Sequence, residues 1–361
     1  MIVESLSLKN YRNYENLQLN FSDGTNIFYG NNAQGKTNIL EAVYMSGTTK
    51  SHRTNKDLEL IRFTEAESHI STMVRKNDIV HKIDIHLKNN KSKGVAIDGI
   101  PIKKASELFG MINFVFFSPE DLNIIKNGPA EKRRFMDIEL CQLNKVYLSD
   151  LANYNKIVLQ RNKVLKDLFF RNDLEDTLDI WDLQLAEYGQ RIIKMREEFV
   201  ERLNEIIFDI HHSLSGGKEE LKIVYLKNCE KDTLLEQLKA SREKDRKLKT
   251  TSVGPHRDDL GFFFDQMDVR KFGSQGQQRC AALSLKLAEI ELVKSTTGDT
   301  PILLLDDVLS ELDKNRQNYL LNHIHDIQAM ITCTGLDEFV NCRFSIDKIF
   351  KVTDGTVVSE N

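Results

Sequence analysis

The sequence predicts an α/β protein in which a β-rich module is split by an inserted, mainly helical lobe. Three observations carry this prediction. Short alternating or apolar runs, bounded by glycine and polar turns, fill residues 1–117. Residues 118–250 hold long stretches with apolar side chains at helical spacing, and β-type runs return after them. We therefore expect one lobe formed by 1–117 together with 251–361, and a second lobe formed by 118–250.

Composition narrows the class of protein. The chain has 361 residues, of which 40% are hydrophobic and 29% charged, so it can bury a sizeable core. No apolar run reaches the roughly 18 residues of a membrane span, and the N-terminus lacks the features of a secretory signal. Scattered cysteines without a C-x-x-C pair indicate reduced thiols and a cytoplasmic location. The net charge of −4 leaves nucleic-acid binding to local patches.

The first lobe begins with strands. Alternation over Val3–Leu8 and Leu17–Phe21 predicts a β-hairpin. Two further strands are expected over Ile70–Val74 and Ile79–Leu87, and Asp98-Gly99 predicts another tight hairpin turn.

The strongest motif reads G-x-x-x-x-G-K-T and follows a short apolar run. A helical pattern comes after it, so the context is the strand–loop–helix of a phosphate-binding P-loop. Backbone N–H groups of such a loop and the helix dipole converge on one anion. Lys36 is expected to reach the β- and γ-phosphates of ATP, and Thr37 to hold Mg²⁺. The predicted nucleotide-binding residues are Gly30, Asn31, Asn32, Ala33, Gln34, Gly35, Lys36 and Thr37.

The inserted segment reads as helices. Ser118 followed by Pro119 predicts a helix start, and two stretches near 143–168 and 178–212 predict a pair of long antiparallel helices. A strand is expected over Leu221–Leu226.

A second strand supplies carboxylates. The apolar run Pro301–Leu305 ends in Asp306 and Asp307. Asp306 is expected to bind Mg²⁺, mostly through water, and Asp307 to act as the general base for an attacking water. A capping role is the alternative for Asp307, and Glu120 is the other candidate for the base.

A polar cluster opens a later helix. Ser274 is expected to be its N-cap, in the string Ser-Gln-Gly-Gln-Gln. Such a helix start can bind an anion, although ordinary capping explains it equally well. The candidate ATP contacts here are Ser274, Gly276 and Gln277, with Ser274 also a candidate catalytic residue.

Together these segments resemble the ATP-binding-cassette ATPases, with Walker A at Gly30–Thr37, Walker B at Leu303–Asp307, the signature motif at Ser274–Gln278 and the D-loop at Ser310–Asp313. Within that superfamily the whole chain resembles the RecF family. The strings that carry the closer resemblance are Leu8–Tyr14, Lys50–Arg53, Phe117–Asp121, Arg133–Asp137 and Gly254–Asp259.

The resemblance implies an ABC-type ATPase head with a compact helical lobe, and hydrolysis of ATP with Mg²⁺ as cofactor. It implies that ATP held by Lys36 of one subunit is covered by Ser274 of another, which closes a homodimer. Related ATPases carry glutamate where Asp307 stands, and histidine in the switch region where Met330–Gly335 offers threonines. Slow turnover is therefore expected.

The resemblance also implies a DNA clamp of recombinational repair. It would close on double-stranded DNA near single-strand/double-strand junctions and help RecO and RecR load the RecA recombinase. Phosphate contacts would dominate, since no base-reading motif is present. For the arginines of residues 133–134, intramolecular pairing with Glu131 and Asp137 is the alternative. The candidate DNA-binding residues are Lys50, His52, Arg53, Lys56, Arg133 and Arg134.

Three other functions fit part of the pattern. A transporter nucleotide-binding subunit would usually carry the glutamate and histidine that are replaced here. A Rad50-type repair ATPase would have a long coiled coil and a C-x-x-C zinc hook, which this sequence lacks. A DNA-binding scaffold that holds ATP without hydrolysing it is the third.

Overall fold

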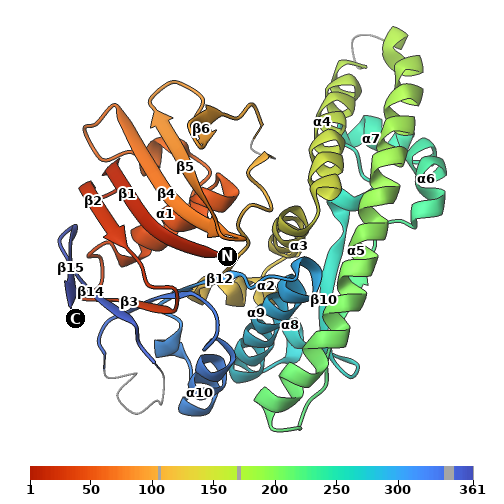
Figure 1. The fold of residues 1–361 in the computed structure, drawn as a ribbon. Helices are drawn as coiled ribbons and strands as arrows, with labels where there is room; N and C mark the ends of the chain where they lie inside the picture. The colour runs from red at the N-terminus through yellow and green to blue at the C-terminus, as the bar shows by residue number, and fades with distance from the viewer. Residues whose placement is uncertain (105–106, 169–171, 337–344, 361) are drawn as a thin grey trace. The chain divides into compact units, whose positions relative to one another are not determined.

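The computed structural model describes residues 1–104, 107–168, 172–336 and 345–360 (Figure 1). The chain divides into two compact units. The first unit comprises Met1–Asp121 and Glu289–Asn361, and the second comprises Leu122–Ala288. Within the described ranges, no helix combines the length and the apolar character needed to cross a membrane.

The first unit contains a mostly parallel six-stranded sheet, ordered β15-β14-β3-β13-β12-β8. Only the edge strand β15 runs antiparallel to its neighbour. The inner strands are almost continuous buried apolar runs, as expected where both faces of a parallel sheet are covered. The strands are β3 (Thr25–Tyr29), β8 (Phe114–Phe117), β12 (Ile302–Asp306), β13 (Ala329–Cys333), β14 (Lys348–Thr353) and β15 (Thr356–Glu360).

An antiparallel sheet of six strands, ordered β2-β1-β4-β5-β6-β7, forms the other layer of this unit. The predicted first hairpin is confirmed, because Leu8 pairs with Leu17 across β1 and β2. Asp98 and Gly99 form the predicted tight turn with φ angles of 52° and 78°. The strands are β1 (Ile2–Tyr11), β2 (Tyr14–Asn20), β4 (Glu67–Lys76), β5 (Ile79–Lys88), β6 (Gly94–Ile97) and β7 (Ile100–Pro101).

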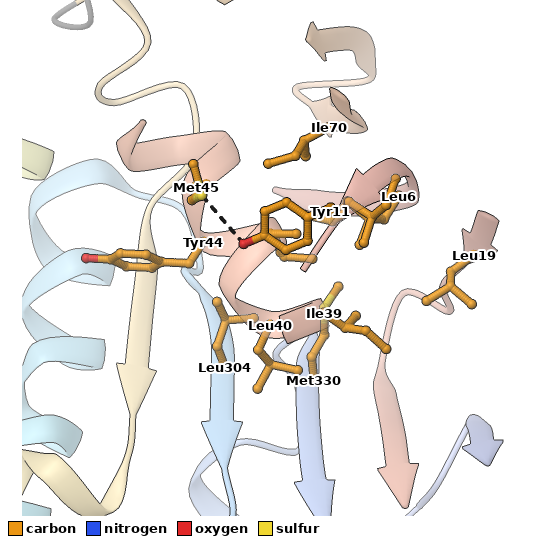
Figure 2. Packing of buried hydrophobic residues seen from close by; sticks show 14 of the residues in the cluster. Leu6, Tyr11, Leu19, Ile39, Leu40, Tyr44, Met45, Ile70, Leu304 and Met330 are labelled. Atoms are coloured by element: carbon orange, nitrogen blue, oxygen red, sulfur yellow. Dashed lines mark hydrogen bonds between the residues drawn. The ribbon is translucent and has the colours of Figure 1, made fainter. Parts of the chain in front are cut away.

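Helix α1 (Lys36–Thr48) packs between the two sheets (Figure 2). Its Ile39 and Leu40 lie in one buried cluster with Leu304 and Met330 of the parallel sheet and Tyr11 of the antiparallel sheet. Burial of each such side chain contributes roughly 1.5–3 kcal/mol. This packing holds the first turn of α1 beside the carboxyl ends of β3 and β12, where the sequence predicts the nucleotide.

The shorter helical elements of the first unit lie in the connections between its strands and helices. The predicted helix start at Ser118 is a 3₁₀ turn, in which the Ser118 N–H donates to the Asp121 carboxylate at 2.7 Å. The elements are η1 (Asp57–Leu60), η3 (Pro119–Asp121), η7 (Leu309–Glu311) and α10 (Lys314–His323).

The second unit is mainly helical, and the predicted pair of long helices is α4 (Lys145–Asp167) and α5 (Leu178–Ser215). A three-stranded sheet, ordered β11-β10-β9, accompanies them, and the predicted strand over Leu221–Leu226 is confirmed as β9. The remaining elements are α2 (Leu122–Lys126), α3 (Pro129–Leu143), η4 (Asn172–Thr177), η5 (Lys231–Thr233), α6 (Leu234–Ala240), α7 (Arg242–Leu248), η6 (Pro255–Arg257), β10 (Asp259–Phe264), β11 (Met267–Asp268) and α8 (Val269–Phe272), with α9 (Gln275–Thr297) running on into residues of the first unit.

The boundary after the insertion differs from the prediction, which placed residues 251–288 with the ATPase lobe. Strand β10 pairs with β9 from Asp259↔Leu226 to Phe264↔Leu221, so this segment completes the sheet of the helical unit. Backbone pairing between strands far apart in sequence leaves no local signal from which the boundary at residue 288 could be predicted.

Two buried arginines hold the helical unit together. Arg161 contacts Asp182 and Asp245 at 2.7 Å each, and all three side chains are fully buried. Arg196 contacts Asp258 at 3.1 Å and Asp137 at 2.8 Å. These bonds connect α3, α4, α5 and α7 to the segment before β10, so charged residues of the 133–137 and 254–259 strings serve packing inside this unit.

Candidate nucleotide site

The P-loop leaves the end of β3 and enters α1, as the motif requires. Gly35 is the N-cap of α1 with φ 108°, a conformation that side-chain-bearing residues rarely adopt. A Cβ at this position would lie 2.5 Å from Asn13 Nδ2, so the turn after β1 closes over the loop. The Tyr14 hydroxyl donates to the Gly35 carbonyl at 3.0 Å and fixes the same point from the side.

Lys36 folds back over the loop. Its Nζ donates to the carbonyl oxygens of Gly30 at 2.5 Å and Asn31 at 2.9 Å. Burial lowers the pKa of Lys36, while the charges of Asp307 and Asp306 act in the opposite direction. The ammonium therefore lies at the mouth of the loop with part of its hydration removed, and phosphate oxygens are stronger partners for it than carbonyls.

Thr37 and Asp306 meet at the end of β12. The Thr37 hydroxyl donates to Asp306 Oδ1 at 2.8 Å, and the hydroxyl of Thr332 donates to the same oxygen at 2.7 Å. Burial raises the pKa of Asp306, and the neighbouring Asp307 charge raises it further. Hard oxygen ligands with an uncompensated negative charge fit Mg²⁺, which usually completes its shell with water and substrate phosphates. Among the described residues there is no cluster of three or more His, Cys, Asp or Glu side chains that could hold a metal ion.

Asp307 has an unusual backbone and an unused side-chain oxygen. Its φ angle is 53°, and its N–H donates to Thr332 Oγ1 at 2.9 Å. Its Oδ1 is buried and makes no hydrogen bond within the described part of the chain. A buried acceptor without a donor is costly in a folded protein, so a ligand or water that donates a hydrogen bond to this atom would relieve the cost.

A cleft of about 540 Å³ runs past these groups. It contains the predicted P-loop residues from Asn32 to Thr37, both Walker B carboxylates and Thr332. Glu120, the alternative base, also lines it. All of these residues belong to the first unit, at Asn32–Asn38, His52, Arg53, Ser118–Glu120, Asp306, Asp307 and Thr332.

Comparison with known proteins identifies the family. The sequence model described as RecF/RecN/SMC N terminal domain matches residues 2–357. DNA replication and repair protein RecF of Lachnospira eligens is 62% identical over 100% of both chains. The chain belongs to the RecF family. The protein of the same name from Agathobacter rectalis is also 62% identical, over 99% of each chain.

Solved structures agree with this assignment. The recombination mediator protein RecF bound to ATP, of the RecFOR pathway, is 37% identical with a TM-score of 0.93, covering 100% of this chain and 98% of that chain. The Smc head bound to the C-winged helix domain of ScpA, at 16% identity and a TM-score of 0.58 over 100% and 98% of the chains, shares the fold alone. The predicted ABC-type ATPase head is thus confirmed.

The RecF-type strings near the cleft converge on Glu41, a residue that sequence reasoning missed. Arg12 donates to both oxygens of the fully buried Glu41 carboxylate, at 2.8 and 2.7 Å. Tyr11 and Ser51 donate to it as well, at 2.9 and 2.5 Å. One buried carboxylate therefore ties the turn after β1 and the loop after α1 to the P-loop helix. The one sequence signal for this role is that Glu41 lies among apolar residues of the predicted helix after the P-loop.

His52 and Arg53, predicted to bind DNA, lie in the nucleotide cleft. The His52 ring packs 4.0 Å from the Phe116 ring, and Arg53 Nη1 donates to Asn38 Oδ1 at 3.0 Å. Lys50 and Lys56 are exposed on the same loop, where Lys56 lies 3.5 Å from Glu59.

The remaining basic candidates lie on α3 of the helical unit. Arg133 donates to the Asp258 carbonyl at 2.6 Å, so it is partly committed to packing. Arg134 is exposed. Asp137, named as a possible intramolecular partner, pairs with Arg196.

The signature segment forms a capping box at the start of α9. Ser274 Oγ accepts from the Gln277 N–H at 3.3 Å, and Gln277 Oε1 accepts from the Ser274 N–H at 2.7 Å. Gln277 Nε2 also donates to Glu219 at 2.6 Å, so that side chain is engaged within the helical unit. Ser274 and Gly276 remain exposed, and Ser274 is the N-cap that the sequence predicts.

Proposed function

We propose that this RecF-family chain is an ATP-dependent clamp for DNA repair. ATP binding drives two chains together on double-stranded DNA near single-strand/double-strand junctions, where the dimer helps RecO and RecR load RecA. Slow, DNA-stimulated hydrolysis to ADP and phosphate then releases the clamp. Such work on chromosomal DNA belongs in the cytoplasm. The observation that supports this function most directly is the unpartnered Asp307 oxygen beside the P-loop cleft.

The proposed chemistry follows from the groups in the cleft. The P-loop backbone and Lys36 bind the β- and γ-phosphates of ATP. Asp307 accepts a proton from a water molecule while the oxygen of that water forms a bond to the γ-phosphorus. The bond from that phosphorus to the β-phosphate oxygen breaks, so ADP leaves with the bonding electron pair. Mg²⁺, held through Thr37 and Asp306, would neutralise charge on the phosphates. Asp is one methylene shorter than Glu, which favours slow turnover.

The proposed dimer uses Ser274 across the twofold axis. Its hydroxyl and the N-terminus of α9 would cover the γ-phosphate held by the partner, so ATP binding and dimerisation become linked. Lys50, Lys56 and Arg134, which are exposed, would contact DNA phosphates. Binding through such contacts weakens steeply with salt.

Sedimentation with and without ATP tests the clamp. The parent is expected to dimerise with ATP, and Ser274→Arg to bind ATP as a monomer, because arginine would collide with the partner's nucleotide.

Lys36→Arg is expected to keep partial nucleotide binding and to lose hydrolysis, since a planar guanidinium does not fit an ammonium site.

Mixing the two variants provides the matched control. A mixed dimer keeps one composite site with intact Lys36 and intact Ser274, so partial ATP-dependent dimerisation should return. If Ser274→Arg alone dimerises at the parent's concentration, the head-to-tail site is refuted.

A further inference from the structure

The first unit contains two Asp-Gly hairpin turns with nearly the same backbone and different surroundings. Asp98–Gly99 joins β6 to β7 with φ angles of 52° and 78°, and Asp354–Gly355 joins β14 to β15 with φ angles of 47° and 72°. A Cβ added to Gly99 would meet nothing within 4 Å. A Cβ added to Gly355 would lie 2.9 Å from the Asn13 carbonyl oxygen. The glycine of the second turn is packed against the turn after β1, whereas the first turn is bonded to β5, where the Asp98 carboxylate accepts from the Lys82 N–H at 2.7 Å.

That second turn is bonded to the P-loop through Gln34. The Asp354 N–H donates to Gln34 Oε1 at 2.5 Å, and the Gly355 N–H donates to the Gln34 carbonyl at 3.4 Å. Asn13 Nδ2 donates to the same carbonyl at 3.0 Å. Gln34 is among the predicted nucleotide-binding residues, and its side chain is engaged by the last hairpin.

The same hairpin also contacts the start of the P-loop. The Tyr29 hydroxyl donates to Glu360 Oε2 at 2.6 Å, and a Cβ on Gly30 would come within 2.3 Å of the Val352 carbonyl oxygen. Strand β14 therefore lies against the first glycine of the loop while its turn holds Gln34. The loop is fixed near both of its ends by residues more than 300 positions away in sequence.

We infer that the β14–β15 turn, Asp354–Gly355, is a positioning element of the P-loop and contributes to ATP affinity without contacting ATP. This inference rests on the proposed nucleotide binding at the P-loop. A glycine-rich loop loses much conformational freedom when it orders around phosphate, and a loop already held in place loses less on binding. Since the turn holds the loop equally in the ground and transition states, it acts on KM more than on kcat.

The two turns make a matched pair of variants, Gly355→Ala and Gly99→Ala. Both place alanine at a positive φ, so both should lower Tm, and Gly355→Ala should lower it further because its Cβ would press against the Asn13 carbonyl oxygen. Only Gly355→Ala should raise the Kd of a fluorescent ATP analogue, by about 2- to 10-fold, the affinity that one hydrogen bond contributes. Its KM should rise equally while kcat stays near the parent value. Gly355→Asn and Gly99→Asn repeat the comparison with less backbone strain, because asparagine tolerates positive φ.

A double-mutant cycle with Gln34→Ala identifies the route of the effect. If the turn acts through Gln34, Gly355→Ala with Gln34→Ala should bind the analogue no more weakly than the weaker single variant. A parent-like Kd for both Gly355 variants would overturn the inference alone, whereas fully additive losses would assign the effect to the Gln34 main-chain carbonyl, which Gln34→Ala keeps and to which the Gly355 N–H donates. If the parent itself fails to bind the analogue, the proposed function falls and the inference falls with it.

Discussion

Carboxylates withdrawn from solvent have different partners in the two compact units, where those of the helical unit are buried and those of the nucleotide cleft are half-buried. In the helical unit, Asp182 and Asp258 are fully buried, and each contacts a buried arginine. In the nucleotide cleft, Asp306 has threonine hydroxyls as its partners and Asp307 has one oxygen with no donor. Within the described ranges, neither of these two has an arginine or lysine at ion-pairing distance.

We interpret this difference as one between carboxylates that stabilise the fold and carboxylates that are available to a ligand. A buried carboxylate costs several kcal/mol unless a cation compensates it, so the helical unit supplies arginine for its own. In the cleft the charges of Lys36 and Arg53 act on the carboxylates without forming an ion pair, and burial raises the pKa of Asp306. A cationic ligand with its nucleotide would relieve that cost. Half-buried carboxylates without a direct ion pair are therefore the physical mark of the site among the described residues.

Asp307→Asn should give the largest effect. An amide cannot take a proton, so turnover should fall by about 10²- to 10⁴-fold while Mg-ATP still binds and the dimer accumulates. Removing an uncompensated charge should leave Tm unchanged or raise it. Phosphate release and thermal unfolding measure the two effects. Parent-like turnover would move the base elsewhere, with Glu120 the next residue to test.

Arg196→Met should show the opposite pattern. It leaves Asp258 and Asp137 without their shared cation, so the free energy of unfolding should fall by about 3–5 kcal/mol. The control is Lys194→Met on the same helix, whose partner Glu198 lies 3.9 Å away at an exposed position, and which should cost no more than about 1 kcal/mol. Denaturant titration measures both, and equal losses would contradict the comparison.

The pH dependence of stability tests whether the helical unit tolerates a positive charge on His256. Burial lowers the pKa of His256 from its usual 6.5 to about 4. The unfolded chain therefore binds this proton at a higher pH than the folded chain, so stability falls as pH drops below about 6.5 and levels off below about 4. The loss is at most about 3 kcal/mol. Denaturant titrations from pH 4.5 to 7 should show a shallower slope for His256→Gln, and an unchanged slope would assign the effect to other groups.

Thr332→Val should have the smallest effect. It removes the hydroxyl that donates to Asp306 and accepts from the Asp307 N–H, while the volume stays the same. Turnover should fall about tenfold, in line with the value of a hydrogen bond to a charged group. Thr332→Ser should restore most of the rate in a steady-state assay. Parent-like turnover in Thr332→Val would contradict the prediction, and loss in both variants would mean that the site needs the methyl group as well as the hydroxyl.

Local features of the chain were sufficient to predict much of this molecule. The P-loop, the strand ending in Asp306, the Asp98-Gly99 turn and the two long helices each depend on neighbouring residues. Residue spacing and the residue types at turns are visible in the sequence itself. The sequence alone therefore indicates the predicted phosphate-binding residues and the family. Lys36, Thr37, Asp306 and Asp307 do lie around one cleft.

Tertiary structure alone decided what each side chain contacts. Gln34 bonds to Asp354, Glu41 gathers Arg12 and Ser51, and residues 251–288 join the helical unit through β9. Each of these depends on partners distant in sequence, and a polar side chain carries no pattern that names its distant partner. The sequence therefore determines which chemistry the chain can perform, while long-range packing determines which residues are free to perform it.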